Sequence, residues 1–133
     1  MLRDLEIKGK RLFYVGVSYK KANVALREKF SLCDTTKSEI LKGAQFKGID
    51  SLIVISTCNR TEMLGFASFA QDLVDLLCKH SQGSLSDFEK VGYTYKNLAA
   101  LQHIFRVGTG LDSQILGDFE IISQVKNLSL IHI

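Results

Sequence analysis

The sequence of 133 residues contains no proline, no internal repeat and no low-complexity stretch. The only linker-like segment is the Gly/Ser cluster at residues 81–86. It is too short to separate two domains, because the residues after it could not fold alone. We therefore expect residues 1–133 to form a single domain, long enough to build a hydrophobic core.

Long apolar runs are also missing. No run approaches the roughly 20 residues that a membrane helix needs, and residues 1–10 alternate charged and apolar side chains without the apolar core of a signal peptide. Hydrophobic residues make up 46% and charged residues 23%, the balance of an ordinary soluble protein. We expect a cytoplasmic protein with no membrane partner. The net charge of +3 is too small to indicate a nucleic-acid partner by itself.

Cysteine is scarce and widely spaced. Three cysteines occur at positions 33, 58 and 78, and none forms a Cys-x-x-Cys pair. This spacing excludes a disulfide framework and gives no indication of a metal site. Cys33 and Cys78 are interpreted as structural, which leaves Cys58 as the cysteine with a special setting.

Hydrophobic periodicity predicts an alternation of strands and helices. Runs rich in β-branched and aromatic residues predict strands at residues 11–17, 51–57, 61–67 and 91–95. Amphipathic spacing predicts helices at residues 23–30, 69–79, 97–107 and 118–128, and another that a Thr36-x-x-Glu39 capping box opens. The order through Tyr95 predicts an α+β fold. Its antiparallel sheet has the ferredoxin-like β-α-β-β-α-β pattern with helices on one face, and the last two helices are added to it.

The chemistry concentrates in residues 56–62 (STCNRTE), between two predicted strands that form a hairpin. Cys58 is expected at the hairpin tip, where a turn can present its side chain to a cleft. A thiolate is a good nucleophile, and positive charge nearby favours it. Arg60 could supply that charge or bind a substrate carboxylate with its planar fork. The alternative is that Cys58 is only a small residue that closes a strand.

A second group of candidate residues follows on the predicted helix 97–107. Leu98, Leu101 and Phe105 recur at helical spacing and predict the packing face of this helix. His103 falls away from that stripe, which allows either a functional histidine or a plain surface residue. Residues 108–110 (GTG) are no dinucleotide fingerprint, because no strand precedes them and no third glycine follows at the right spacing.

Three motifs, taken together, resemble one known family. Residues 56–62 resemble the signature around the nucleophilic cysteine of glutamyl-tRNA reductases. Residues 103–126 (HIFRVGTGLDSQILGDFEIISQVK) resemble the second signature of that family, and residues 16–28 (GVSYKKANVALRE) are similar to its first motif. The three motifs stand in the family's order and cover most of the chain.

The resemblance implies a reaction and a set of residues that perform it. Members reduce glutamyl-tRNA to glutamate 1-semialdehyde with NADPH, the first step of tetrapyrrole (haem) synthesis by the C5 route. Carried over, Cys58 forms a thioester with the glutamyl group, and His103 assists by donating a proton or hydrogen bond. Arg60 would bind a substrate carboxylate. The rest of the glutamate pocket would comprise Thr57, Asn59, Ser113 and Gln124.

The family also extends beyond what this sequence contains. Its NADPH-binding and dimerisation domains are expected to be absent from this chain, so the isolated chain is not expected to reduce its substrate. The resemblance implies that the full-length protein is a homodimer and that the next enzyme of the pathway, an aminomutase, is a possible partner. The sequence departs from the family at Tyr19, Asn23 and Phe119, which replace the usual histidine, proline and proline, and residues 127–133 do not resemble the usual continuation.

Two other functions remain open from the residues. A ferredoxin-like domain could bind a protein or RNA without catalysis, and such a domain would have no reason to activate Cys58. A cysteine hydrolase is also compatible, since a thioester formed without hydride transfer would end in hydrolysis.

Overall fold

A computed structural model describes residues 6–7 and 9–109, which form strands and helices in alternation. The strands are β1 (Glu6–Ile7), β2 (Lys10–Ser18), β3 (Asp50–Ser56), β4 (Arg60–Ala67) and β5 (Tyr93–Lys96). The helices are α1 (Val24–Phe30), α2 (Asp34–Phe46), α3 (Ala70–His80), α4 (Leu85–Val91) and α5 (Leu98–Gly108). The predicted helix at residues 118–128 lies outside the described part.

All strand pairs of the sheet are antiparallel. Strand β2 pairs with β4 on one side and with β1 and β5 along the other, while β3 pairs with the outer edge of β4. Helices α1 and α2 connect β2 to β3, a hairpin connects β3 to β4, and α3 and α4 lead to β5. The α+β class and the ferredoxin-like strand order predicted from the sequence are confirmed.

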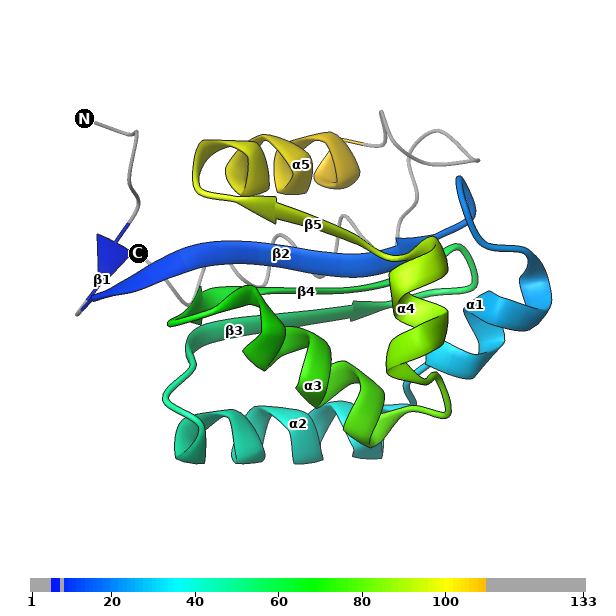
Figure 1. Ribbon diagram of the computed structural model, residues 1–133, viewed down its shortest axis with the longest axis horizontal. Coiled ribbons are helices and arrows are strands. Elements are labelled where there is room, and N and C mark those ends of the chain that lie inside the picture. Colours follow the sequence, from blue (N-terminus) through cyan, green and yellow to red (C-terminus); the bar gives the residue numbers. More distant parts are fainter. Residues whose placement is uncertain (1–5, 8, 110–133) are drawn as a thin grey trace.

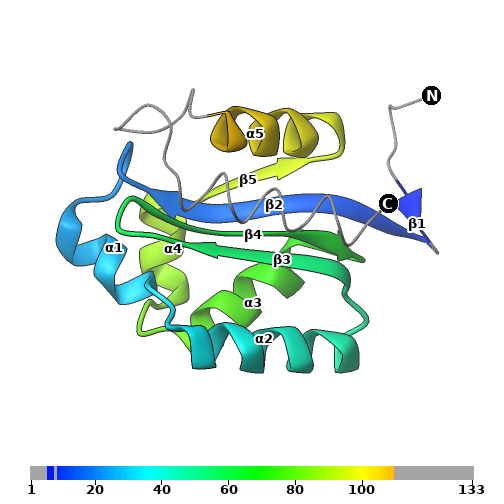
Figure 2. The ribbon, with the colours of Figure 1, turned by 180° about the vertical axis from the view of Figure 1, so that it is seen from behind.

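The sheet has an apolar core on each face. Helices α2 and α3 lie on one face and α5 lies on the other, as Figure 1 and the reverse view in Figure 2 show. Alternate residues of β2 point to opposite faces: Val15 packs in the core beneath α2 and α3, and Tyr14 packs in the core beneath α5. The functional side chains described below lie at this second face and at one end of the sheet.

The start of α2 differs from the prediction. The helix begins at Asp34 with Cys33 as its N-cap, so Thr36 and Glu39 do not form a capping box. The first turn is closed by the bond from Lys37 N to Cys33 O at 2.9 Å, and Asp34 places a negative charge at the helix N-terminus, which the helix dipole favours. The backbone therefore enters the helix three residues earlier than the side-chain motif suggests, with its N-cap at Cys33 instead of Thr36.

The segment before β5 also differs. Helix α4 occupies most of the segment after the Gly/Ser cluster, and Val91 ends this helix instead of beginning the strand. Ser84 and Asp87 form a reciprocal capping box, with bonds of 3.0 Å and 3.3 Å, that opens the helix. Phe88 then packs against Phe30, which anchors a helix too short to be stable alone.

The packing face of α5 was predicted correctly for Leu101, which packs against the core, and wrongly for Leu98 and Phe105. The helix buries Ala100, His103, Ile104 and Val107, whereas Phe105 is 62% exposed and Leu98 is 42% exposed. Both faces of α5 contain apolar residues, so periodicity alone could not choose between them. The sheet accepts the face that places small and β-branched side chains against Leu12 and Leu64 and the imidazole of His103 against the rings of Tyr14 and Tyr95.

Within the described residues, none of the helices combines the length and the apolar character that crossing a membrane requires.

Gly16 is required where β2 and β4 approach most closely. It pairs with Glu62 across the two strands, and a Cβ atom placed at Gly16 would lie 2.5 Å from Glu62 Cγ and 2.8 Å from the carbonyl oxygen of Thr61. The second neighbour is backbone and cannot rotate away. Only glycine lets the Glu62 side chain occupy this space.

We predict that Gly16→Ala lowers the free energy of unfolding by about 1–3 kcal/mol, the range for inserting a methyl group into a filled site. Gly43→Ala is the matched control, because nothing lies within 4 Å of a Cβ atom at this position in α2. That control should gain roughly 0.5–1 kcal/mol from alanine's helix preference. Urea unfolding of the two variants measures both, and equal stability of both would contradict the steric argument.

Candidate functional site

Cys58 lies on a tight turn between β3 and β4, as the sequence predicted. The last ladder pair joins Ser56 and Thr61, and Thr57 N donates to the carbonyl of Arg60 at 2.8 Å. Cys58 and Asn59 are the central residues of the turn. The Cys58 side chain is exposed, while Asn59 is buried and its carbonyl accepts a 2.9 Å bond from Tyr19 N. The turn is thus fixed at Asn59, and the thiol of the neighbouring Cys58 is exposed.

A cavity of about 530 Å³ borders Cys58. It is formed by the turn residues Thr57, Cys58 and Asn59 on one side and by the start and end of α1 on the other. Arg27 of α1 crosses to the turn, where its Nε donates to the carbonyl of Cys58 at 3.3 Å. The guanidinium bound at the turn is therefore that of Arg27, which the sequence analysis did not assign to the site.

Glu62 is the centre of a buried polar cluster beneath α5. Its carboxylate is fully buried and accepts hydrogen bonds from the hydroxyls of Tyr14, at 2.6 Å, and Tyr93. It also pairs with Arg60 NH1 at 3.4 Å and with His103 Nε2 at 2.9 Å. Glu62 was part of the motif in the sequence but received no role there. A charged residue directly before the apolar residues 63–67 of β4 is the signal that could have found it.

The cluster around Glu62 determines which ring nitrogen of His103 donates a hydrogen bond. Burial and the neighbouring Glu62 raise the pKa of the Tyr14 and Tyr93 hydroxyls, so both stay protonated and donate. A carboxylate can only accept, so the hydrogen in its bond with His103 is on Nε2, and Nδ1 is the nitrogen left for a ligand. The ring is held by stacking on Tyr95 and an edge contact with Tyr14, each with 4.5 Å between ring centroids.

Arg60 points into the protein from the end of the turn. Its side chain has no exposed surface, and its guanidinium lies 5.9 Å from the ring centroid of Tyr19, within cation–π range. Arg60 therefore joins the turn that carries Cys58 to the cluster around Glu62. Tyr19, which stands where the resembling family has histidine, covers it.

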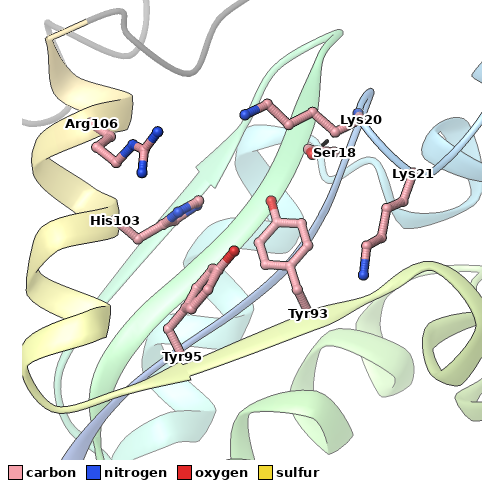
Figure 3. Close-up of a pocket in the computed structure, with 7 residues that line it drawn as sticks. All are labelled: Ser18, Lys20, Lys21, Tyr93, Tyr95, His103 and Arg106. Atoms are coloured by element: carbon pink, nitrogen blue, oxygen red, sulfur yellow. Dashed lines mark hydrogen bonds between the residues drawn. The ribbon is translucent and has the colours of Figure 1, made fainter.

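His103 lines a different cavity from Cys58. This cavity has a volume of about 150 Å³ and lies between α5 and the end of β2. Figure 3 shows His103 and Arg106 reaching in from α5, Lys20 from the segment after β2, and the hydroxyls of Tyr93 and Tyr95 from β5. In the described part of the chain, no residue lines both cavities. Contacts between residues lead from one to the other: Asn59 accepts a bond from Tyr19 N, and the Tyr19 ring lies against the guanidinium of Arg60.

The other two cysteines differ from each other. Cys78 is partly covered in α3, and burial raises the pKa of its thiol. Cys33 is exposed, and its hydrogen bond with Thr36 at the start of α2 lowers the pKa of its thiol. The sequence analysis gave Cys33 no such setting. Cys33 and Cys58 are thus both exposed.

The described residues do not fit NADPH or a metal ion. A dinucleotide pyrophosphate needs a glycine-rich turn between a strand and a helix N-terminus. The connection from β2 to α1 contains no glycine and ends in the side-chain cap Asn23, and that from β4 to α3 is capped by Asp72. No group of three His, Cys, Asp or Glu residues among residues 6–7 and 9–109 could hold a metal ion.

Not all of the predicted site residues can be placed. Ser113 and Gln124 lie outside the described residues. Thr57, Cys58 and Asn59 meet at one cavity, while His103 faces the other and Arg60 is buried between the two.

Comparison with known proteins assigns the chain to a family. Residues 15–130 match the family described as "Glutamyl-tRNAGlu reductase, N-terminal domain". A glutamyl-tRNA reductase of Christiangramia forsetii is 56% identical over 119 residues, which cover 90% of this chain and 28% of that protein. Glutamyl-tRNA reductase 2 of Flavobacterium johnsoniae is 57% identical over 115 residues, 86% of this chain and 26% of that protein.

A solved structure agrees with the sequence relatives. Glutamyl-tRNA reductase from Methanopyrus kandleri superimposes with a TM-score of 0.68 and 26% identity, over 89% of this chain and 27% of that one. The chain thus spans about a quarter of the length of the relatives it matches. On these matches, this chain belongs to the glutamyl-tRNA reductase family and corresponds to its N-terminal domain.

Proposed function

We propose that this chain performs the acyl-transfer part of a glutamyl-tRNA reductase, in which Cys58 takes the glutamyl group from glutamyl-tRNA as a thioester. The observation that carries the proposal is the exposed Cys58 on a two-residue turn at the mouth of a cavity. The fixed carbonyl of Asn59 and the bond from Arg27 hold the turn, so the thiol is presented in one place.

The proposed step is an acyl transfer. The Cys58 thiolate attacks the carbonyl carbon of the ester between glutamate and the tRNA ribose. A carbon–sulfur bond forms, the carbon–oxygen bond to the ribose breaks, and the ribose oxygen leaves as a hydroxyl after taking up a proton. His103, which Glu62 holds through Nε2, assists at that oxygen. For His103 to reach the oxygen, the substrate must extend from the Cys58 cavity to the His103 cavity.

The remaining residues of the proposed glutamate pocket are Thr57, Asn59, Arg60, Ser113 and Gln124. Arg60 binds a substrate carboxylate in this proposal. Because its guanidinium is buried beneath Tyr19, this contact requires the Tyr19 ring to move aside. Glu62 then keeps the guanidinium in place while the ring moves, because Arg60 and Glu62 form an ion pair two positions apart on the same strand.

The reduction to glutamate 1-semialdehyde at the entry to tetrapyrrole synthesis is proposed for the longer protein. Its NADPH would be bound by residues outside the described part, because those described do not fit it. We propose a homodimer for that longer protein and the aminomutase that follows in the pathway as a possible partner.

The first prediction from the proposed function concerns Cys58. The chain should release glutamate from glutamyl-tRNA above the background hydrolysis of the ester, because water can attack the thioester when no hydride is supplied. Cys58→Ser should abolish this release, whereas Cys33→Ser should leave it unchanged. The assay is free glutamate from charged tRNA over time, together with the mass of the acylated peptide. Release that persists in Cys58→Ser would remove Cys58 from the reaction.

The second prediction concerns reduction. Addition of NADPH to this chain should produce no semialdehyde and should not change the rate of glutamate release, since the described residues do not fit a dinucleotide. Trapping of aldehyde with a hydrazine reagent measures the product. Aldehyde formed by this chain would show that a cofactor site exists within its 133 residues.

The third prediction concerns Glu62 as the residue that positions His103 and Arg60. Glu62→Gln should lower the free energy of unfolding by about 3 kcal/mol, because the buried Arg60 loses the charge of its partner. It should also mix the two His103 tautomers, because an amide can donate to the ring nitrogen as well as accept from it. Nitrogen-15 NMR of the imidazole reports the tautomer.

Tyr93→Phe is the control for this pair of effects. It removes one hydrogen bond to Glu62 but leaves the carboxylate, so it should cost about 1 kcal/mol and keep the Nε2–H tautomer. A Glu62→Gln protein with the wild-type tautomer and wild-type stability would exclude the positioning role.

A further inference from the structure

The cavity between α5 and the end of β2 has the chemistry of an anion site. Three cationic side chains line it, Lys20 and Lys21 from the segment after β2 and Arg106 from α5, together with Ser18, His103, Tyr93 and Tyr95. Figure 3 shows the side chains of Lys20 and Arg106 extending over the cavity from opposite sides. No acidic residue of the described part is among those that line it.

The carboxylate of Glu62 is shielded from this space. Glu62 lies beneath the cavity, where it is fully buried and bonded to His103 and Tyr93, two of the residues that form the cavity wall. Its charge is offset by Arg60 within the same cluster. Among the described residues, the charged side chains that line the cavity are those of the exposed cations Lys20, Lys21 and Arg106.

The size of the cavity limits its occupant. A volume of about 150 Å³ is well below the roughly 300–1,000 Å³ of pockets that enclose a drug-sized ligand. One phosphate group with its attached oxygens suits this space, and a whole nucleotide does not. The exposed Tyr95 at the rim, 36% accessible, offers a ring face against which an adjacent base can stack.

We propose that this cavity binds a backbone phosphate at the 3′ end of the RNA whose glutamyl ester reaches Cys58. The inference rests on the proposed function, since it takes RNA as the carrier of the acyl group. A substrate anchored there by its phosphate passes His103, which lines the cavity, and extends over Tyr19 and Arg60 to the turn at Cys58. The cavity thereby sets where the ester lies between the two candidate catalytic side chains.

The test measures binding of an uncharged RNA minihelix with a single-stranded 3′ end to the full chain, over a range of salt concentrations. Lys20→Gln/Arg106→Gln should raise the dissociation constant about tenfold and lower the slope of log K against log salt by about 1, as expected when one phosphate is no longer neutralised. Lys42→Gln, an exposed lysine of α2 on the other face of the sheet, changes the net charge by one and should change neither quantity strongly.

The outcomes separate the two proposals. Equal RNA affinity and salt slope in the double variant and the wild type would overturn the phosphate site, as would an equal loss of affinity in Lys42→Gln. If the double variant loses affinity for inorganic phosphate but not for the minihelix, the site binds free phosphate, and the RNA assignment is wrong. Because the RNA carries no ester, the series can be repeated in Cys58→Ser, so failure of the acyl-transfer proposal leaves this result unaffected.

Discussion

The buried carboxylate of Glu62 is the group on which the rest of the site depends. A charge without exposed surface is stable only when donors surround it, and here two tyrosine hydroxyls, a histidine and an arginine do so. These donors come from β2, β4, β5 and α5, so one side chain joins four elements of the fold. The close approach of β2 and β4 that admits the carboxylate is possible because Gly16 stands opposite it.

The cluster around Glu62 and the exposed Cys58 differ in burial and in how they are held. The Glu62 carboxylate is inside the protein and is held by four partners, whereas the thiol is presented on a turn of minimal length. Arg60 links the two, because it begins the strand that leaves the turn and its guanidinium reaches Glu62. A substrate that displaces the Tyr19 ring would contact a guanidinium that is already oriented, which reduces the cost of organising the site upon binding.

The two cavities differ in the chemistry of the residues that line them. The larger cavity, beside Cys58, is bordered by polar turn residues and by Arg27 and Glu28 of α1. The smaller one is lined by cations and aromatic side chains. In the proposed substrate, the amino acid and the phosphate lie at opposite ends of the aminoacyl ester. The cationic lining of the smaller cavity is compatible with the substrate that family membership led us to propose.

Much of the fold could be predicted from the sequence because its signals are local. The uninterrupted apolar run before Cys58 and the short polar segment after it determined the hairpin, and the position of Cys58 at its tip follows from the turn length alone. The ferredoxin-like strand order follows from the succession of elements. The motif resemblance identified the candidate residues, although it could not say which of them meet.

Only the tertiary structure decided the surroundings of these residues. Helix α5 has apolar side chains on two faces, and its orientation depends on the sheet it meets, so the burial of His103 could not be read from periodicity. Glu62 contacts Tyr14 and His103 across 48 and 41 residues of sequence, and Arg60 is buried because Tyr19 folds over it. Local patterns determine where a chain turns and which residues alternate, but contacts between distant segments depend on the packing of the whole sheet against its helices.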